Sequence, residues 1–129
     1  MPIEYELSRN GRVIYQRYSD PLDMRDVVAH FHKYQSEILD RASAPIHMIT
    51  DTTGLNHVPG NILSGGLTTL RQTHPMGGEI VIIARGGFIN AMAQVFQRMA
   101  KNQTIAVVHT VEEAWVYVDG LLAKENPPA

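Results

Sequence analysis

The sequence predicts an α/β fold: a mixed, mostly parallel five-stranded sheet in the order β-β-α-β-α-β-α-β-α. Short runs rich in Ile and Val alternate with longer stretches of helical apolar periodicity, which is typical of parallel strands joined by helices. Near the start, two alternating runs, 3–9 and 12–18, are separated by Asn10-Gly11. This pair accepts positive φ and favours a two-residue hairpin turn, so the first strand is predicted to be an antiparallel edge.

The first helix is predicted to begin after the hairpin. Asp20 is its expected N-cap, Pro21 suits the first helical position, and Asp23 favours the positive end of the helix dipole. The helix is expected to end near Ala42, because Pro45 follows.

The remaining elements follow in order. We expect a strand at 46–50, a turn-rich exit loop at 51–60, a helix at 61–72, a strand at 79–84, a helix after Gly86-Gly87 and a strand at 104–109. Thr110 and Glu113 have the spacing of a capping box and open a final helix that runs to about 124. Residues 1–125 thus form one predicted domain, and 126–129 a flexible tail.

Composition excludes several classes of protein. The 129 residues contain no Cys, which rules out disulfides, thiolate zinc sites and a cysteine nucleophile. The net charge of -2 and the absence of a basic run disfavour nucleic-acid binding. No signal peptide or transmembrane segment is recognisable, so a cytoplasmic protein is expected. No P-loop pattern is present, and no cofactor is predicted.

The order of elements resembles that of STAS (anti-sigma-factor antagonist-like) domains across nearly the whole chain. Asp51-Thr52-Thr53-Gly54-Leu55 is similar to the family's Asp-Ser-Ser-Gly phosphorylation motif. In the family, however, an Asp-x-x-Gly-aliphatic segment also leaves the third strand, and the phosphoacceptor follows a second aliphatic residue. With Val58 as that residue, the acceptor positions fall on 59–62, Pro-Gly-Asn-Ile, which carry no hydroxyl. The resemblance therefore implies a STAS-like domain without a phosphoacceptor, Thr52 being the runner-up.

Ligands of open parallel sheets bind beyond the carboxyl ends of the strands. The residues predicted at this edge, as a ligand or partner site, are Asp51, Thr53, Asn56, His57, Asn61, Arg85, Gly86, Gly87 and His109. An anion would be expected at Gly86-Gly87, although a solvated turn is the favoured interpretation. His30 and His32 lie about 200° apart on a helix and cannot share an ion. His57, His109 and Asp51 could form a three-ligand site, but scattered surface histidines are favoured and no metal is predicted.

The predicted function is a non-enzymatic binding or regulatory module that acts through protein contacts. The alternative is a domain for a small apolar ligand or a lipid, by analogy with STAS-like and CRAL-TRIO-like proteins. An enzyme using His57, Arg85 and His109 is a third hypothesis. Six residues could serve a core, an apolar pocket or a partner surface, the core being favoured: Met76, Phe88, Met92, Phe96, Met99 and Trp115.

A homodimer is also predicted. Residues 80–83 are consecutive aliphatics, so two of them point to each face of the sheet. Right-handed crossovers that always step in one direction put their helices on the same face. The opposite face would then be bare and apolar, and a two-fold interface would cover it. The alternative is that one helix, the first or the last, crosses to that face and makes a two-sided domain.

Overall fold

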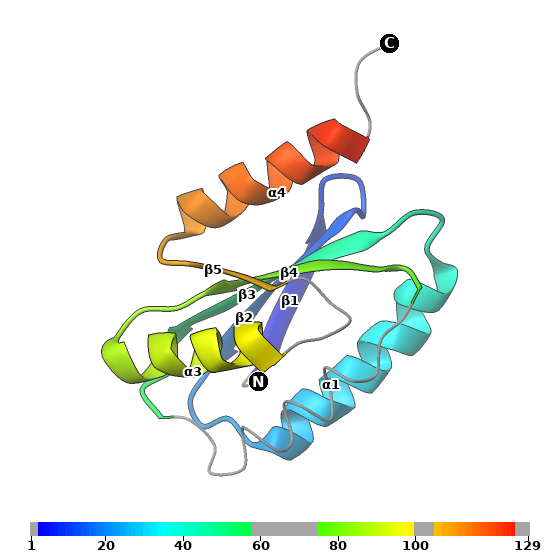
Figure 1. The fold of residues 1–129 in the computed structure, drawn as a ribbon. Coiled ribbons are helices and arrows are strands. Elements are labelled where there is room, and N and C mark those ends of the chain that lie inside the picture. Colours follow the sequence, from blue (N-terminus) through cyan, green and yellow to red (C-terminus); the bar gives the residue numbers. More distant parts are fainter. Residues whose placement is uncertain (1–2, 58–74, 100–104, 126–129) are drawn as a thin grey trace.

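The computed structural model describes residues 3–57, 75–99 and 105–125. One five-stranded sheet has the order β1-β2-β3-β4-β5, from β1 (Ile3–Ser8) through β2 (Val13–Ser19), β3 (Ile46–Gly54) and β4 (Gly77–Ile83) to β5 (Ile105–Val108). The β1–β2 pair is antiparallel, and the pairs β2–β3, β3–β4 and β4–β5 are parallel. The helices of the described residues, α1 (Met24–Glu37), α3 (Gly87–Met99) and α4 (Val111–Glu125), pack on this sheet (Figure 1). The predicted mixed, mostly parallel α/β fold is confirmed, while the predicted helix at 61–72 and the tail lie outside the described residues.

The hairpin turn has the predicted backbone. Asn10 and Gly11 have φ values of 58° and 80°, and the Arg12 N–H donates to the Arg9 carbonyl across 3.2 Å. Arg9 also has a positive φ, of 54°, which was not predicted. The ladder of β1 and β2 consequently ends at the Ser8–Val13 pair. The first strand thus ends one residue earlier, and the second begins one residue later, than predicted.

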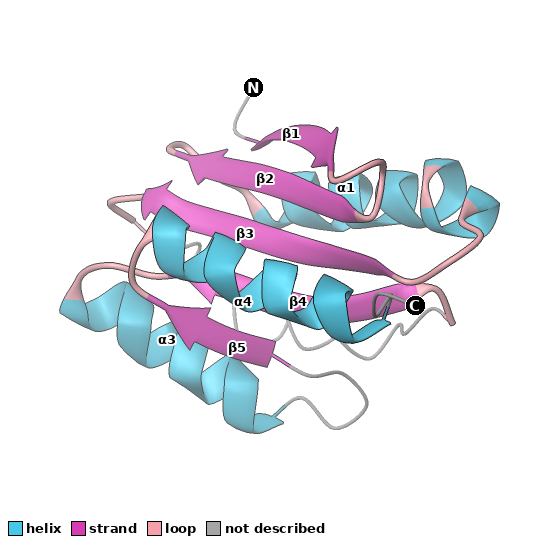
Figure 2. Cartoon of the chain, turned by 90° about the horizontal axis from the view of Figure 1, so that it is seen from above, coloured by secondary structure: helices cyan, strands magenta, loops and turns pink. Residues whose placement is uncertain are grey.

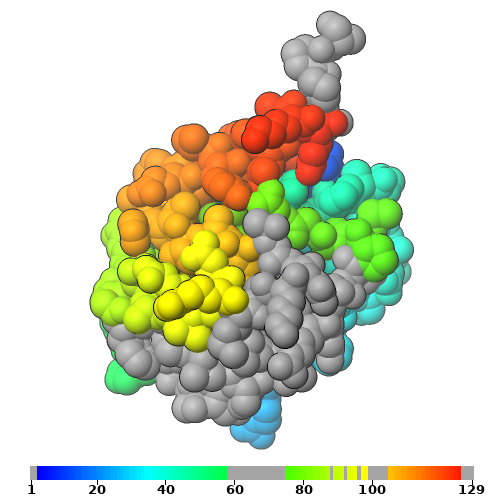
Figure 3. All heavy atoms as spheres, in the orientation of Figure 1, coloured from blue at the N-terminus to red at the C-terminus, as the bar shows by residue number. Residues whose placement is uncertain are grey.

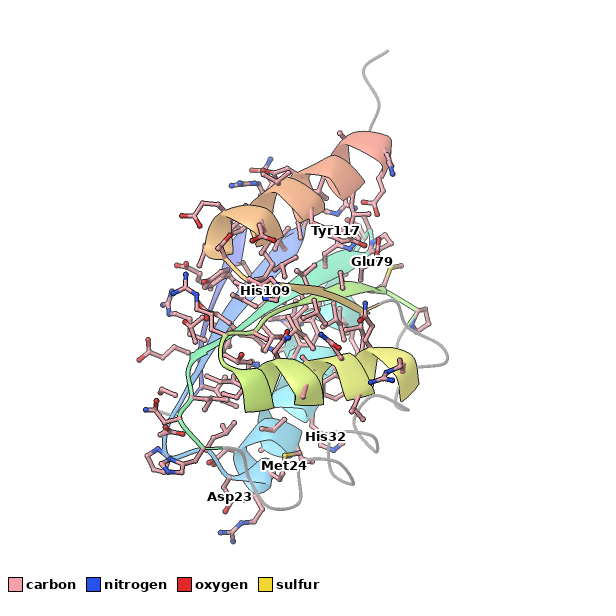
Figure 4. The ribbon with its side chains drawn as sticks, turned by 60° about the vertical axis from the view of Figure 1, so that its left-hand side comes forward. Asp23, Met24, His32, Glu79, His109 and Tyr117 are labelled. Carbon is pink, nitrogen blue, oxygen red and sulfur yellow. The ribbon has the colours of Figure 1, made fainter. Side chains whose placement is uncertain are left out.

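Several predicted boundaries are wrong, including those of β4, which covers Gly77–Ile83 and not 79–84. The N-cap of α1 is Asp23, whose side chain accepts from the Arg25 N–H, and not Asp20 (Figure 4). Asp20 lies outside the helix and instead accepts from the Asn56 N–H at 2.7 Å. The third strand does not end at residue 50, because Asp51, Thr52 and Thr53 continue β3 as far as Gly54. Helix α1 ends at Glu37, before the predicted end near Ala42, and a separate short 3₁₀ turn, η1 (Leu39–Arg41), follows it.

The two faces of the sheet are both covered. Helices α1 and α3 lie on one face, and α4 lies across the other (Figures 1 and 2). Val81 and Ile83 of β4 pack with Ala114 and Val118 of α4 in a fully buried cluster. The bare face on which the homodimer prediction was based is therefore absent from the described structure, so that argument was wrong.

The handedness rule nevertheless holds where it applies. Helices α1 and α3 each join two parallel strands, and they share one face as right-handed crossovers require. Helix α4 follows β5 and does not connect two of the described strands, so the rule does not constrain its side. Burial of the aliphatic side chains of β4 decides its position instead.

Helix α4 is fixed at both ends. At its start, Thr110 Oγ1 accepts from the Glu113 N–H at 3.1 Å, which confirms the predicted cap. At its end, Oε1 of Glu125 lies 2.9 Å from Nε2 of the buried His47, and the same carboxylate forms an ion pair with Arg12. His47 Nδ1 accepts from the Glu79 N–H at 2.9 Å, and a Cβ at Gly78 would lie only 2.4 Å from that nitrogen. Glycine is therefore required beside His47.

Candidate functional site

The carboxyl end of β3 holds a buried carboxylate. Asp51 is 6% exposed, and both of its oxygens are engaged. Oδ2 accepts from the Tyr15 hydroxyl at 2.6 Å, while Oδ1 accepts from the Thr53 hydroxyl at 2.6 Å and from the Thr53 N–H at 2.9 Å. Three internal donors therefore hold this side chain, and we call the group of Asp51, Tyr15 and Thr53 the Asp51 network.

The strands and α4 position this network. Asp51 on β3 pairs in register with Arg17 on β2. Tyr15 lies two residues before Arg17 and therefore on the same face of the sheet, so the side chains of Tyr15 and Asp51 both point toward α4. Trp115 of α4 stacks on the Tyr15 ring with 5.9 Å between centroids and 7° between planes. The Arg9 guanidinium lies 4.3 Å from the centre of Trp115 on the same stack. The aromatic stack thus shields the carboxylate from solvent and orients the Tyr15 hydroxyl.

Burial alone would raise the pKa of Asp51. Hydrogen bonds from Thr53 and Tyr15, together with the nearby Arg17 charge, outweigh burial and hold that pKa below its ordinary value of 3.8. Burial of the ring and the hydrogen bond to Asp51 raise the pKa of Tyr15 far above its usual range. Asp51 is thus a fixed anion, and a strongly hydrogen-bonded carboxylate of this kind is a poor general base at neutral pH.

Thr52 faces away from the Asp51 network. Its side chain is buried, and its hydroxyl donates to the Ile83 carbonyl at 2.6 Å. A hydroxyl tied to the neighbouring strand in this way is inaccessible to a kinase in this conformation. That Thr52 is not a phosphoacceptor stays a prediction, and positions 58–62, including Asn61, lie outside the described residues.

The loops after β4 and β5 are held together. Arg85 Nε donates to the His109 carbonyl at 3.2 Å, and His109 Nδ1 lies 3.2 Å from the Ala84 carbonyl (Figure 4 labels His109). Gly86 has a φ of 85° and directly precedes the first residue of α3, Gly87. Arg85, Gly86, Gly87 and His109 therefore form one exposed region.

The remaining predicted residues belong to a separate loop. His57 is exposed, with Nδ1 3.8 Å from Asp20, and the Asn56 N–H donates to that same carboxylate. The predicted edge thus divides into the Asp51 network, the Arg85–His109 region and the Asp20–His57 loop. Within 3–57, 75–99 and 105–125, no group of three His, Asp or Glu side chains could hold a metal ion.

A second buried polar network lies on the opposite face of β2 and β3, under α1. Gln16 is 2% exposed; its Nε2 donates to Thr50 Oγ1 at 2.8 Å, and its Oε1 lies 2.7 Å from Nε2 of His30. Burial, with a smaller effect of Lys33, lowers the pKa of His30. A neutral imidazole therefore donates to Gln16. From the sequence, we considered His30 only as a metal ligand and did not predict these contacts. Gln16, Thr50 and His30 are called the Gln16 network below.

A polar hollow beside β5 was also missed. It encloses about 380 Å³ and is lined by Asn90, Gln94, Gln97, Arg98, Val107 and His109. The first four share one side of α3, at the i, i+4, i+7 and i+8 spacing, and this helical stripe of amides was the available sequence signal. Figure 3 shows the yellow surface of α3 next to the gold surface of β5.

No family model matches the sequence, and no curated protein matches it. The chain is similar in structure to an uncharacterised protein of the DUF3478 family from Shewanella loihica PV-4, whose fold is described as SpoIIAA-like. The TM-score is 0.66 at 14% identity, over 89% of this chain and 90% of that one. The likeness shows the fold, which is STAS-like. Membership of the STAS family stays a prediction. No helix in the described ranges is long and apolar enough to cross a bilayer.

Proposed function

We propose that the protein is a non-enzymatic STAS-like module that acts through protein contacts at the carboxyl end of its sheet. One observation carries this proposal: the polar groups there are tied to one another. Both Asp51 oxygens are occupied by internal donors, and the Arg85 side chain bonds the His109 carbonyl. Such an arrangement favours a preformed recognition surface over acid–base chemistry, which needs a titratable group within reach of a substrate.

The alternative of an apolar ligand or a lipid receives less support. The hollow that the structure describes is lined by amide, guanidinium and imidazole groups, with Val107 as its aliphatic member. Pockets for apolar molecules are lined mainly by hydrophobic and aromatic side chains. The exposed Arg85–His109 region, in contrast, offers charge and backbone groups to a macromolecular partner.

Site-specific photocrosslinking in the cells that make the protein tests the proposal. A photoreactive amino acid at Gly87 probes the carboxyl end, and one at Gly120, on α4, is the matched control. Both glycines are exposed, and a Cβ at either position meets no atom within 4 Å. We expect a discrete polypeptide adduct from Gly87 and none from Gly120. An adduct with a second copy of the chain would identify the predicted homodimer as the partner.

Two results would contradict the proposal. One is the absence of any adduct from Gly87 under conditions in which the photoreactive group is incorporated and reactive. The other is native mass spectrometry showing a retained apolar molecule, which would favour the ligand-binding alternative.

A further inference from the structure

The fifth strand is the outer edge of the sheet. Among the strands that the structure describes, β5 pairs with β4 alone, and the Ala84 N–H donates to the Val108 carbonyl. Backbone groups of successive residues in a strand point to alternate sides, so those of Val108 and Ala106 point toward β4. The N–H and C=O of Ile105 and Val107 therefore point away from the sheet. An outward edge of this kind is a template for another strand.

Side chains of α3 reach this edge. Gln97 Nε2 donates to the Ile105 carbonyl at 2.9 Å, which places the polar stripe of α3 beside the outward backbone groups. Asn90, Gln94 and Arg98 continue the stripe along the hollow, whose other wall includes Val107 and His109. The hollow is therefore a groove between an edge strand and a helix, next to the Arg85–His109 region (Figure 2 shows β5 and α3 side by side).

The chemistry of the groove matches a peptide backbone. The amide side chains of Asn90, Gln94 and Gln97 line it. Amide side chains both donate and accept, and Val107 adds one backbone donor and one acceptor. An extended peptide presents N–H and C=O groups in the same alternation, whereas a compact ligand would use the side chains alone.

We propose that the groove between β5 and α3 binds an extended segment of a partner protein by strand addition to β5. The segment pairs with the outward N–H and C=O of Val107 and lies along the amide side chains of α3 that line the groove. This inference rests on the proposed function, and it names the surface and the conformation of the partner.

The test uses peptides selected against the full chain from a display library of random linear peptides. Val107→Pro removes the outward N–H without touching the ladder to β4, and proline is tolerated on edge strands. Val107→Ala is the matched control, because it keeps that N–H. We expect Val107→Pro to weaken the selected peptide by about tenfold or more, and Val107→Ala to change its affinity by much less.

Asn90→Leu gives a second measurement that does not depend on the fold of β5. This similarly sized change should weaken the peptide about threefold to tenfold, because one polar side chain that lines the groove is replaced by an apolar one. On binding, the Val107 amide should also become protected from hydrogen exchange.

Other outcomes overturn the inference. Selected peptides that bind with no effect of Val107→Pro or Asn90→Leu, or no selected peptide at all, exclude strand addition at this groove. Binding of a small polar molecule that is sensitive to Asn90→Leu but not to Val107→Pro would identify a side-chain ligand site instead. A Gly87 adduct obtained alongside these results would leave the proposed function intact, whereas its absence would remove both.

Discussion

The two polar networks lie on opposite faces of the same two strands, yet they are built differently. The Asp51 network centres on an ionised carboxylate that receives three internal hydrogen bonds under α4. The Gln16 network, under α1, centres on a neutral amide that joins Thr50 to a half-buried imidazole. Hydrogen bonds to a buried charge are stronger, and their loss costs more, than those between neutral groups. The difference predicts unequal stabilities and separate pH responses.

The largest effect is expected from Asp51→Ala. The change leaves the Tyr15 hydroxyl and both Thr53 donors without their acceptor, so the free energy of unfolding should fall by about 3 kcal/mol. Urea denaturation followed by circular dichroism measures it. Asp51→Asn retains one acceptor oxygen and should lose about half as much. Equal losses in the two variants would show that the charge and the hydrogen bonds it receives are not what stabilises this region.

A smaller effect is expected from Gln16→Leu. Thr50 and His30 lose a neutral partner, and the apolar side chain regains part of the loss by burial, so the free energy of unfolding should fall by about 1–2 kcal/mol. The same denaturation experiment measures this variant. A loss as large as that of Asp51→Ala would break the distinction between the two networks.

Tyr15→Phe removes one donor to Asp51 and keeps the ring that stacks on Trp115. We expect a loss of about 1 kcal/mol in the free energy of unfolding. The pKa of Asp51 should rise toward its ordinary value, because one stabilising hydrogen bond is gone. Carboxyl-carbon NMR titration reads this pKa directly, and an unchanged titration curve would show that Tyr15 does not support the charge.

The pH responses give the finest distinction. The lowered pKa of His30 means that the unfolded chain binds its proton more readily, so stability is full above about pH 6.5 and falls as the pH decreases through that value. The slope is at most about 1.4 kcal/mol per pH unit. His30→Gln should remove this dependence, as measured by denaturation between neutral and mildly acidic pH.

Asp51 also loses its contribution to stability as the pH falls, but it does so over a lower pH range than His30. Its carboxylate is favoured in the folded state, so its contribution is full above about pH 4 and is lost as the pH falls through the lowered folded pKa. The difference in stability between the protein and Asp51→Asn should therefore remain constant while His30 titrates. A difference that already shrinks near pH 6 would show that the networks titrate together.

Much of the architecture follows from local sequence. Asn10-Gly11 defines the hairpin because positive φ is a property of those residues themselves, and Thr110 with Glu113 defines the start of α4 through contacts three residues apart. The alternation of strand and helix patterns is equally local, and it predicted the sequential mixed sheet. The exposed Arg85–His109 region followed from strand ends alone, because parallel strands finish at one edge.

The tertiary structure decided what local patterns do not encode. The face chosen by α4 depends on Val81 and Ile83, which are distant in sequence from Ala114 and Val118. The role of Asp51 depends on Tyr15, 36 residues away, whose hydroxyl reaches it only after β2 pairs with β3. The sequence by itself determined the elements and their order, because these rest on short-range conformational preferences. The tertiary structure decided which polar side chains are buried together, because that choice rests on long-range packing and on the need of each buried polar group for a partner.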